Sequence, residues 1–321
     1  MRGYCAGTLP QTPASSQACG KTPLTQPLAC EFLPMPTYLS TAQLEAYRRD
    51  GFLMLPDFAS AEACLKIRAQ GMALAASLVP PPEKATVFTA DGGEGGHVAD
   101  DYFLGSGGDI RCFFEKDAFD TAGQLRADAH LCLNKLGHAL HDRDEHFAAF
   151  SRTPELAALA ADIGFLDPRL LQSMYIFKQP RIGGEVSCHT DHTFLWTEPR
   201  SCVGFWFAID DATTENGCMW ALPGGHHLPV KVRSRLNAER TRAVMDVYDT
   251  EPYPTTGLVS LEAKRGTLVL LDGALPHLSG PNHSAEPRHA YTIHAIEGAA
   301  RYLPDNWLQR EVAELRGFAP V

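Results

Sequence analysis

The sequence lacks a long uninterrupted hydrophobic run and lacks an excess of positive charge. No stretch approaches the roughly 18 apolar residues that a membrane-spanning helix needs, so we expect no membrane insertion. The formal net charge of −10 disfavours general nucleic-acid binding, because that function needs a basic surface. The chain has 321 residues, of which 45% are hydrophobic and 21% charged, which is typical of a globular protein with one large domain and a substantial core.

The nine cysteines lack the pattern of a disulfide scaffold or a structural zinc site. Their number is odd, their spacing is irregular, and no C-x-x-C pair occurs. The N-terminal region also lacks the continuous apolar segment of a secretory signal. We therefore expect a reducing, intracellular location, with the cytoplasm favoured.

Acidic residues are missing from the beginning of the chain. Before Glu31 the only charged residues are Arg2 and Lys21, and Ser, Thr, Pro, Ala and Cys are abundant. This composition fits either a disordered tail or a transit segment for organelle import. We therefore treat residues 1–36 as lying outside the fold and residues 37–321 as one catalytic domain.

Helical signals concentrate in the first half of that domain. Ser40 followed by Gln43 forms a capping box, which predicts a helix to about Asp50. An apolar strand follows at 52–55, and apolar residues at helical spacing continue until three consecutive prolines. The sequence thus predicts further helices over 60–78, over much of 128–142 and from 154, and a glycine-rich loop over 91–108.

Short apolar segments between turn residues dominate the second half. Helices followed by many strands indicate an α+β protein with a jelly-roll core. Each predicted strand is flanked by Gly, Pro, Asn or Asp, as antiparallel sheets require. The predicted strands are Gln172–Lys178, Val186–Asp191, Val203–Ile209, Cys218–Leu222, Thr267–Leu271 and Ala290–Ile296.

A candidate metal site begins at His189 and Asp191. Residues i and i+2 of a strand point to the same face, so this imidazole and this carboxylate could share one ion. The pair alone is weak evidence, because the chain has 13 histidines. His277 follows an apolar run downstream and could complete a ligand set of two imidazoles and one carboxylate. This set leaves three positions of an octahedral ion open, as in non-haem iron(II) oxygenases that use 2-oxoglutarate.

Arg288 follows His277 near the start of the last predicted strand. A dicarboxylate cosubstrate that chelates iron through its keto acid needs a cation for its distal carboxylate, and arginine offers a planar two-pronged donor. Taken alone, Arg288 is better explained as a surface residue of the turn that contains Pro287.

The order of these residues resembles the phytanoyl-CoA dioxygenase family. The resemblance runs from about Leu39 to about Gln309. It rests on His189-x-Asp191, His277-x-Ser279, Arg288, Asn216-Gly217 and Pro223-Gly224-Gly225-His226. The stretches 134–141, 172–180 and 197–199 look like one branch, the group of phytanoyl-CoA dioxygenase domain-containing protein 1.

The resemblance implies a double-stranded β-helix, of the jelly-roll or cupin-like kind, with flanking helices. It also implies Fe(II) held by His189, Asp191 and His277, with 2-oxoglutarate and O2 as cosubstrates and ascorbate as a supporting reductant. The implied cosubstrate contacts are Arg288, Ser279, Trp206, Lys135 and Met174.

Several neighbouring residues have simpler explanations. We expect His192 to point to the opposite strand face from Asp191, with a substrate-side or surface role. His226 is expected to be a structural hydrogen-bonding residue, and His289 and His294 to be core or surface residues. Cys188 is expected to face away from the metal.

The carboxylate of Asp191 favours hydroxylation over halogenation, because related halogenases have a small residue there to make room for chloride. Desaturation, ring formation and epimerisation stay open as outcomes. Two other functions also stay open, a non-catalytic metabolite-binding jelly roll with a vestigial metal site and a zinc hydrolase. The hydrolase would need a general base near the metal, and the sequence identifies none.

The substrate is expected to be a small organic molecule; the family name suggests an acyl-CoA, and a peptide, a lipid or a secondary metabolite fits equally well. A coenzyme A ester would need basic residues at the cavity mouth, for which Arg181, Lys231, Arg233 and Arg235 are candidates. The loop 230–256 is expected to border the entrance, and loops of this kind often set specificity. The sequence indicates no oligomeric state.

Overall fold

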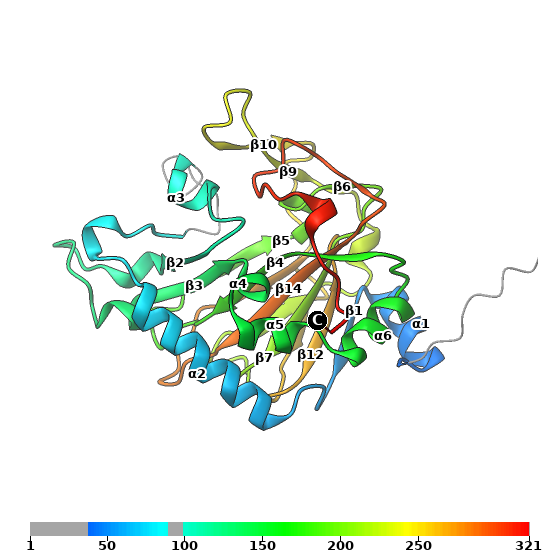
Figure 1. Cartoon of the computed structure of the whole chain (residues 1–321), viewed down its shortest axis with the longest axis horizontal. Helices are drawn as coiled ribbons and strands as arrows, with labels where there is room; N and C mark the ends of the chain where they lie inside the picture. The colour runs from blue at the N-terminus through cyan, green and yellow to red at the C-terminus, as the bar shows by residue number, and fades with distance from the viewer. Residues whose placement is uncertain (1–37, 89–98, 321) are drawn as a thin grey trace, which may run out of the picture. The chain divides into compact units, whose positions relative to one another are not determined.

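A computed structural model of the chain describes residues 38–88 and 99–320 (Figure 1). The expectations for residues 1–36 and for the 91–98 part of the glycine-rich loop lie outside these residues. The helices are α1 (Thr41–Asp50), α2 (Ala61–Leu78), α3 (Asp101–Leu104), α4 (Leu140–Arg143), α5 (Glu145–Ser151) and α6 (Pro154–Asp162). In the described ranges, none of the helices is both long and apolar enough to cross a membrane.

Most of the strands belong to two antiparallel sheets. The larger has the order β1-β12-β7-β14-β4-β3-β2, and the smaller has the order β11-β8-β13-β5. The strands are β1 (Phe52–Leu55), β2 (Ile110–Phe114), β3 (Leu133–His138), β4 (Pro168–Ile176), β5 (Val186–His189), β6 (Thr197–Glu198), β7 (Val203–Ala208), β8 (Met219–Ala221), β9 (Val232–Leu236), β10 (Ala243–Val247), β11 (Val259–Leu261), β12 (Leu268–Asp272), β13 (His277–Ser279), β14 (Ala290–Glu297) and β15 (Arg301–Tyr302).

The two sheets pack face to face. Trp206 and Val269 of the larger sheet share an apolar cluster with Met219 and Ala221 of the smaller one. Two antiparallel sheets that enclose a core in this way form a jelly roll. The predicted α+β class and double-stranded β-helix core are therefore confirmed.

Helices cover the other face of the larger sheet, as Figure 1 shows for α2 and α5. The Phe147 ring of α5 packs against Tyr175 of β4 and Tyr291 of β14. Because side chains alternate along a strand, Tyr291 and Ile293 face the helices, while Thr292 and His294 face the smaller sheet. This alternation sorts each central strand into a structural face and a cavity-lining face.

The predicted helix over 128–142 is wrong. Residues 129–132 form a 3-10 helix, β3 follows, and only Leu140–Arg143 are α-helical. β3 lies between β2 and β4 and pairs with both, so its backbone groups form sheet hydrogen bonds on both sides. Pairing between distant segments outweighs the local helical pattern here.

Other predicted elements agree closely with the structure. The helix over 60–78 is α2, the capping box of Ser40 and Gln43 begins α1, and α6 begins at Pro154. The strand predicted over 186–191 ends at His189, and Asp191 begins a 3-10 turn, Asp191–Thr193. The predicted loop 230–256 contains the β9–β10 hairpin.

Candidate metal and cosubstrate site

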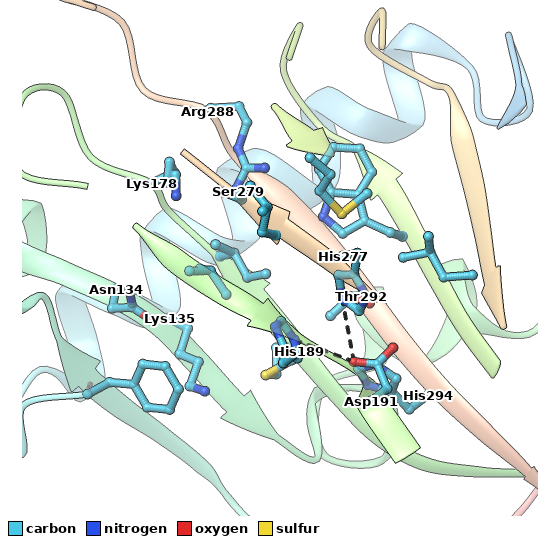
Figure 2. A pocket seen from close by; sticks show the side chains of 18 residues that line it. Asn134, Lys135, Lys178, His189, Asp191, His277, Ser279, Arg288, Thr292 and His294 are labelled. Atoms are coloured by element: carbon cyan, nitrogen blue, oxygen red, sulfur yellow. Dashed lines mark ion pairs between the residues drawn. The ribbon is translucent and has the colours of Figure 1, made fainter. Parts of the chain in front are cut away.

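One cavity between the sheets brings together all eight residues that the sequence nominated. Six of them lie on strands of the two sheets, Asp191 lies in the turn after β5, and Arg288 lies just before β14 (Figure 2). They are Lys135, Met174, His189, Asp191, Trp206, His277, Ser279 and Arg288. The cavity is the consequence of the strand alternation, which points every second side chain of β4, β7 and β14 inward.

His189, Asp191 and His277 form a group that could hold a metal ion. One nitrogen or oxygen atom of each lies within 4.8 Å of the others. Asp191 Oδ1 is 3.9 Å from His189 Nε2 and 3.8 Å from His277 Nε2. His189 and His277 are direct neighbours across the β5–β13 pair. Asp191 reaches them from the 3-10 turn, so the shared strand face assumed from the sequence is not what aligns it.

The donor atoms of both histidines are oriented for a metal. His189 Nδ1 contacts the Ser187 carbonyl oxygen at 2.8 Å, and His277 Nδ1 contacts the Leu275 carbonyl oxygen at 2.9 Å. A carbonyl only accepts, so each Nδ1 carries the hydrogen and each Nε2 is left with a lone pair. Outer bonds of this kind fix the tautomer of metal-binding histidines. The three residues therefore fit a divalent metal.

The electrostatics of the group favour a neutral imidazole beside an ionised carboxylate. Burial lowers the pKa of His189 to about 4, assisted by the nearby His277. Burial alone would raise the pKa of Asp191, but His294, His277 and His189 together hold it well below its usual range. Metal ligation needs these same protonation states.

His294 and Gly204 hold the far side of the Asp191 carboxylate. His294 Nε2 lies 3.2 Å from Asp191 Oδ2, and His294 Nδ1 lies 3.0 Å from Gln172 Nε2. A Cβ atom at position 204 would come within 3.2 Å of Asp191 Oδ2, so the glycine leaves the space that this carboxylate occupies. Asp191 Oδ1 is thereby left to face His189 and His277.

We expect His294→Ala to weaken metal binding by about 10–100-fold, because it removes the group that orients Asp191. Calorimetric titration of the metal-free protein with Mn(II) measures the affinity. His289→Ala is the matched control, since His289 is equally buried but contacts Tyr175 on the helix-covered face. Equal Mn(II) affinity in wild type and His294→Ala would contradict the positioning role.

Arg288 lies at the end of the cavity away from the metal group (Figure 2), and Trp206 lines the cavity beside it. The Arg288 side chain is 2% exposed, and its Nε and Nη1 atoms have no hydrogen-bond partner among the described residues. Its guanidinium lies 5.4 Å from the centre of the Trp206 ring. Burial lowers the pKa of Arg288 to about 10, so it stays charged at neutral pH. A buried cation with unused donors fits an anionic ligand group.

Lys135 supplies another buried amine on the cavity wall. Its Nζ lies 3.4 Å from the centre of the Phe88 ring, and burial lowers its pKa to about 7. Met174 and Ser279 also line this cavity, and the Ser279 hydroxyl donates to the Gly217 carbonyl at 3.2 Å. The five nominated cosubstrate contacts therefore line one cavity.

Sequence reasoning missed other residues that line the cavity. Lys178, Thr292 and His294 were not assigned to the site, although each follows from a spacing of two residues along a strand. His294 lies two residues after Thr292, and Lys178 lies four residues after Met174. Every second residue counted along the chain from Met174 and from Arg288 is expected to point into the same cavity. This rule would have identified all three residues.

The histidines with simpler explanations have mixed outcomes. His226 Nε2 contacts the Arg48 carbonyl at 3.1 Å, in keeping with a structural role. His289 is in the core, as expected, but His294 lies in the site beside Asp191. The expected surface alternative for His192 is wrong, because this side chain is 1% exposed and packs against Trp196. Its buried position follows from the turn that replaces the end of the predicted strand.

Solved structures share the fold at low sequence identity. EctD from S. alaskensis, solved with 2-oxoglutarate and 5-hydroxyectoine, matches with a TM-score of 0.60 and 18% identity, over 88% of this chain and 87% of that one. The non-heme alpha ketoglutarate dependent carbocyclase SnoK from nogalamycin biosynthesis matches with a TM-score of 0.59 and 17% identity, over 88% and 93% of the two chains.

Curated relatives are much closer in sequence. Phytanoyl-CoA dioxygenase domain-containing protein 1 of Mus musculus is 40% identical over 276 residues, which cover 84% of this chain and 95% of the relative. Its homolog in Dictyostelium discoideum is also 40% identical, over 84% and 96% of the two chains. The sequence profile of phytanoyl-CoA dioxygenase (PhyH) matches residues 47–290. Because the profile spans most of the described domain and the site, this chain belongs to the phytanoyl-CoA dioxygenase family.

Proposed function

We propose that this protein is an Fe(II)- and 2-oxoglutarate-dependent dioxygenase that hydroxylates a small organic substrate and releases succinate and CO2. The observation that carries the proposal is the pairing of two groups in one cavity. A two-histidine, one-carboxylate set with its Nε2 atoms free lies at one end, and a buried arginine with unused donors lies at the other.

In this proposal His189, Asp191 and His277 occupy one face of the metal and leave the other face to the keto acid and O2. Bound iron and 2-oxoglutarate supply the oxidising power, with ascorbate keeping the metal reduced. Arg288 binds the distal carboxylate, and Trp206 packs beside it to keep water out. Ser279, Lys135 and Met174 complete the cosubstrate wall.

Two observations bear on the other functions that the sequence left open. A vestigial site would be expected to lose ligands or their supporting bonds, whereas here all three ligands and the outer contacts of both histidines are present. A zinc hydrolase would leave Arg288 buried without a role. Asp191 fills the position that a halogenase keeps open, which supports hydroxylation as the outcome.

Three of the four basic residues considered for coenzyme A, all except Arg181, have other partners. Lys231 is ion-paired with Asp249, Arg233 with Asp305, and Arg235 with Asp246. Cations already neutralised by neighbouring carboxylates give no reason to expect phosphate binding. The proposed substrate is therefore a small organic molecule, without commitment to a thioester.

The decisive test is succinate formation from 2-oxoglutarate by the purified full chain. We expect turnover with Fe(II), O2 and ascorbate, stimulated by substrate-containing metabolite fractions, and no turnover with Zn(II) or without O2. Hydrolysis supported by Zn(II) and independent of O2 would favour the hydrolase. Binding of 2-oxoglutarate without succinate in any fraction would favour the metabolite-binding protein.

A further inference from the structure

A second buried cation, Lys178, lies at the arginine end of the cavity. It follows β4, and its spacing from Met174 and Ile176 places it on the same inward face as these two lining residues. Lys178 is 2% exposed. Figure 2 shows it with Arg288 and Ser279 at the end of the cavity away from Asp191.

The backbone holds Lys178 and Arg288 together. The Lys178 carbonyl accepts from the Arg288 backbone N–H at 3.2 Å and from the Asn282 side chain at 2.8 Å. Lys178 has a φ of 42°, a left-handed conformation that is uncommon for a residue with a side chain. Such conformations persist where surrounding contacts impose them, and they gather at ligand sites. The position of this lysine is thus specified by several independent contacts.

The Lys178 ammonium has donor capacity that the protein does not use. Its Nζ donates to the Gly184 carbonyl at 2.7 Å, which accounts for one of its three N–H groups. No carboxylate in the described ranges lies within ion-pair distance of it. Glu115 is an acidic residue whose charge acts on Lys178 and favours its charged form. Its Oε2 accepts from the Gly184 N–H at 3.3 Å, so it lies next to the residue that Lys178 contacts.

The buried charged groups at this end of the cavity have an excess of cations, since Glu185, which also faces Lys178, is exposed to solvent. Lys178 and Arg288 contribute two positive charges, and the buried Glu115 contributes one negative charge when ionised. Burial lowers the pKa of Lys178 to about 7, and repulsion by Arg288 adds to the effect. Burying uncompensated charge is costly, so a carboxylate that neutralised the excess would stabilise the charged lysine.

We propose that Lys178 and Arg288 form a two-cation receptor for the distal carboxylate of the keto acid cosubstrate, with Lys178 giving selectivity for dicarboxylates. This inference rests on the proposed function. Arg288 supplies the planar donors and Lys178 a compact charge from the neighbouring strand end. Ser279 lines the same end of the cavity, beside Arg288 (Figure 2).

The test compares two keto acids that share the chelating head. 2-Oxopentanoate has the same chain length as 2-oxoglutarate but carries a methyl group in place of the distal carboxylate. The full chain is loaded with Mn(II), which prevents turnover, and each keto acid is titrated by calorimetry. We expect Lys178→Met to weaken 2-oxoglutarate binding by about 10–100-fold, as for loss of a charged hydrogen bond, and to change 2-oxopentanoate binding by less than about twofold.

Lys66→Met is the matched control, because Lys66 is an exposed lysine on α2 that is paired with Glu62. It should leave both affinities unchanged. Equal weakening of both keto acids in Lys178→Met would mean that Lys178 only supports the cavity wall, and an unchanged 2-oxoglutarate affinity would mean that it has no role; either result overturns the inference. If wild type binds Mn(II) but neither keto acid, the proposed function itself fails.

A second measurement uses wild type alone and so does not depend on the folding of a variant. The charged or titratable groups facing Lys178 are Arg288, Glu115, Glu185 and Cys218. Burial raises the pKa of Cys218 to about 11, so neither it nor Arg288 changes charge between pH 7 and 9. Deprotonation over this range of the two lining lysines whose pKa is lowered to about 7, Lys178 and Lys135, should reduce the affinity ratio of 2-oxoglutarate to 2-oxopentanoate by about threefold or more. A ratio that stays constant from pH 7 to pH 9 would contradict the receptor.

Discussion

Replacing Asp191 with alanine is expected to reduce 2-oxoglutarate turnover by about 1000-fold or more, equivalent to about 4 kcal/mol in the barrier. Asp191 is the only carboxylate of the metal group, and its Oδ1 faces both histidines at 3.8–3.9 Å. Without it, two neutral imidazoles must hold a divalent ion with no compensating charge. The measurement is succinate formed per protein in Fe(II) and O2, together with Mn(II) affinity by calorimetry.

Asp211→Ala provides the comparison for that experiment. Asp211 is ion-paired with Lys264 outside the cavity, so its loss should leave both turnover and Mn(II) affinity at wild-type values. The metal assignment would be wrong if Asp191→Ala kept full activity. Loss of activity with unchanged Mn(II) affinity would instead show that the carboxylate acts on the substrate rather than on the metal.

The second large effect concerns stability rather than chemistry. Asp142 accepts from Arg152 Nη2 at 2.6 Å and from Arg310 Nη2 at 2.5 Å, and it lies 3.2 Å from His141 Nε2. The Arg152 side chain is 3% exposed. Asp142→Asn keeps the shape but leaves buried positive charge without its partner. We expect the free energy of unfolding to fall by about 3–5 kcal/mol, measured by urea denaturation.

The pH dependence of this effect has a definite sign. Burial alone would raise the pKa of Asp142, but His141, Arg310 and Arg152 hold it well below its usual range. Its contribution is therefore fully present above the unfolded pKa of about 3.9 and is lost as the pH falls further. The difference between wild type and Asp142→Asn should shrink below about pH 4.

Asp249→Asn is the control for that measurement. Asp249 pairs with Lys231 on the β9–β10 side and is about half exposed, so its loss should cost less than about 1 kcal/mol. If Asp142→Asn lowered the free energy of unfolding no more than Asp249→Asn does, the buried cluster around Asp142 would not be an important source of stability.

Much of the site could be predicted from the sequence because its signals are local. His189 and Asp191 are two residues apart, and His277 and Arg288 each lie beside an apolar strand. Their shared cavity follows once those strands belong to one jelly roll. The prediction that Asp191 lies on a strand was wrong, yet the three predicted ligands do lie together, because residues two apart stay close in a 3-10 turn as well.

The rest depended on contacts between distant segments. β3 was predicted as part of a helix because its pairing with β2 and β4 cannot be recognised from the sequence of β3 itself. His294 could be placed in a strand, but its contact with Asp191 comes from the packing of β14 beside β7. The proposed role of Lys178 depends on Arg288, which lies 110 residues later in the chain. The Arg288 backbone N–H donates to the Lys178 carbonyl. Side-chain alternation limits which residues face inward, but only the strand order says which of them meet.

The direct pairing of His189 with His277 makes the metal site sensitive to strand alignment. A one-residue slip of β5 against β13 would turn one imidazole to the opposite face of the smaller sheet. The donor set therefore exists only when these two strands are in register, and an ion bound there would fasten them together. Metal binding would then stabilise the sheet in its correct register and would not stabilise a sheet in which the two strands are misaligned.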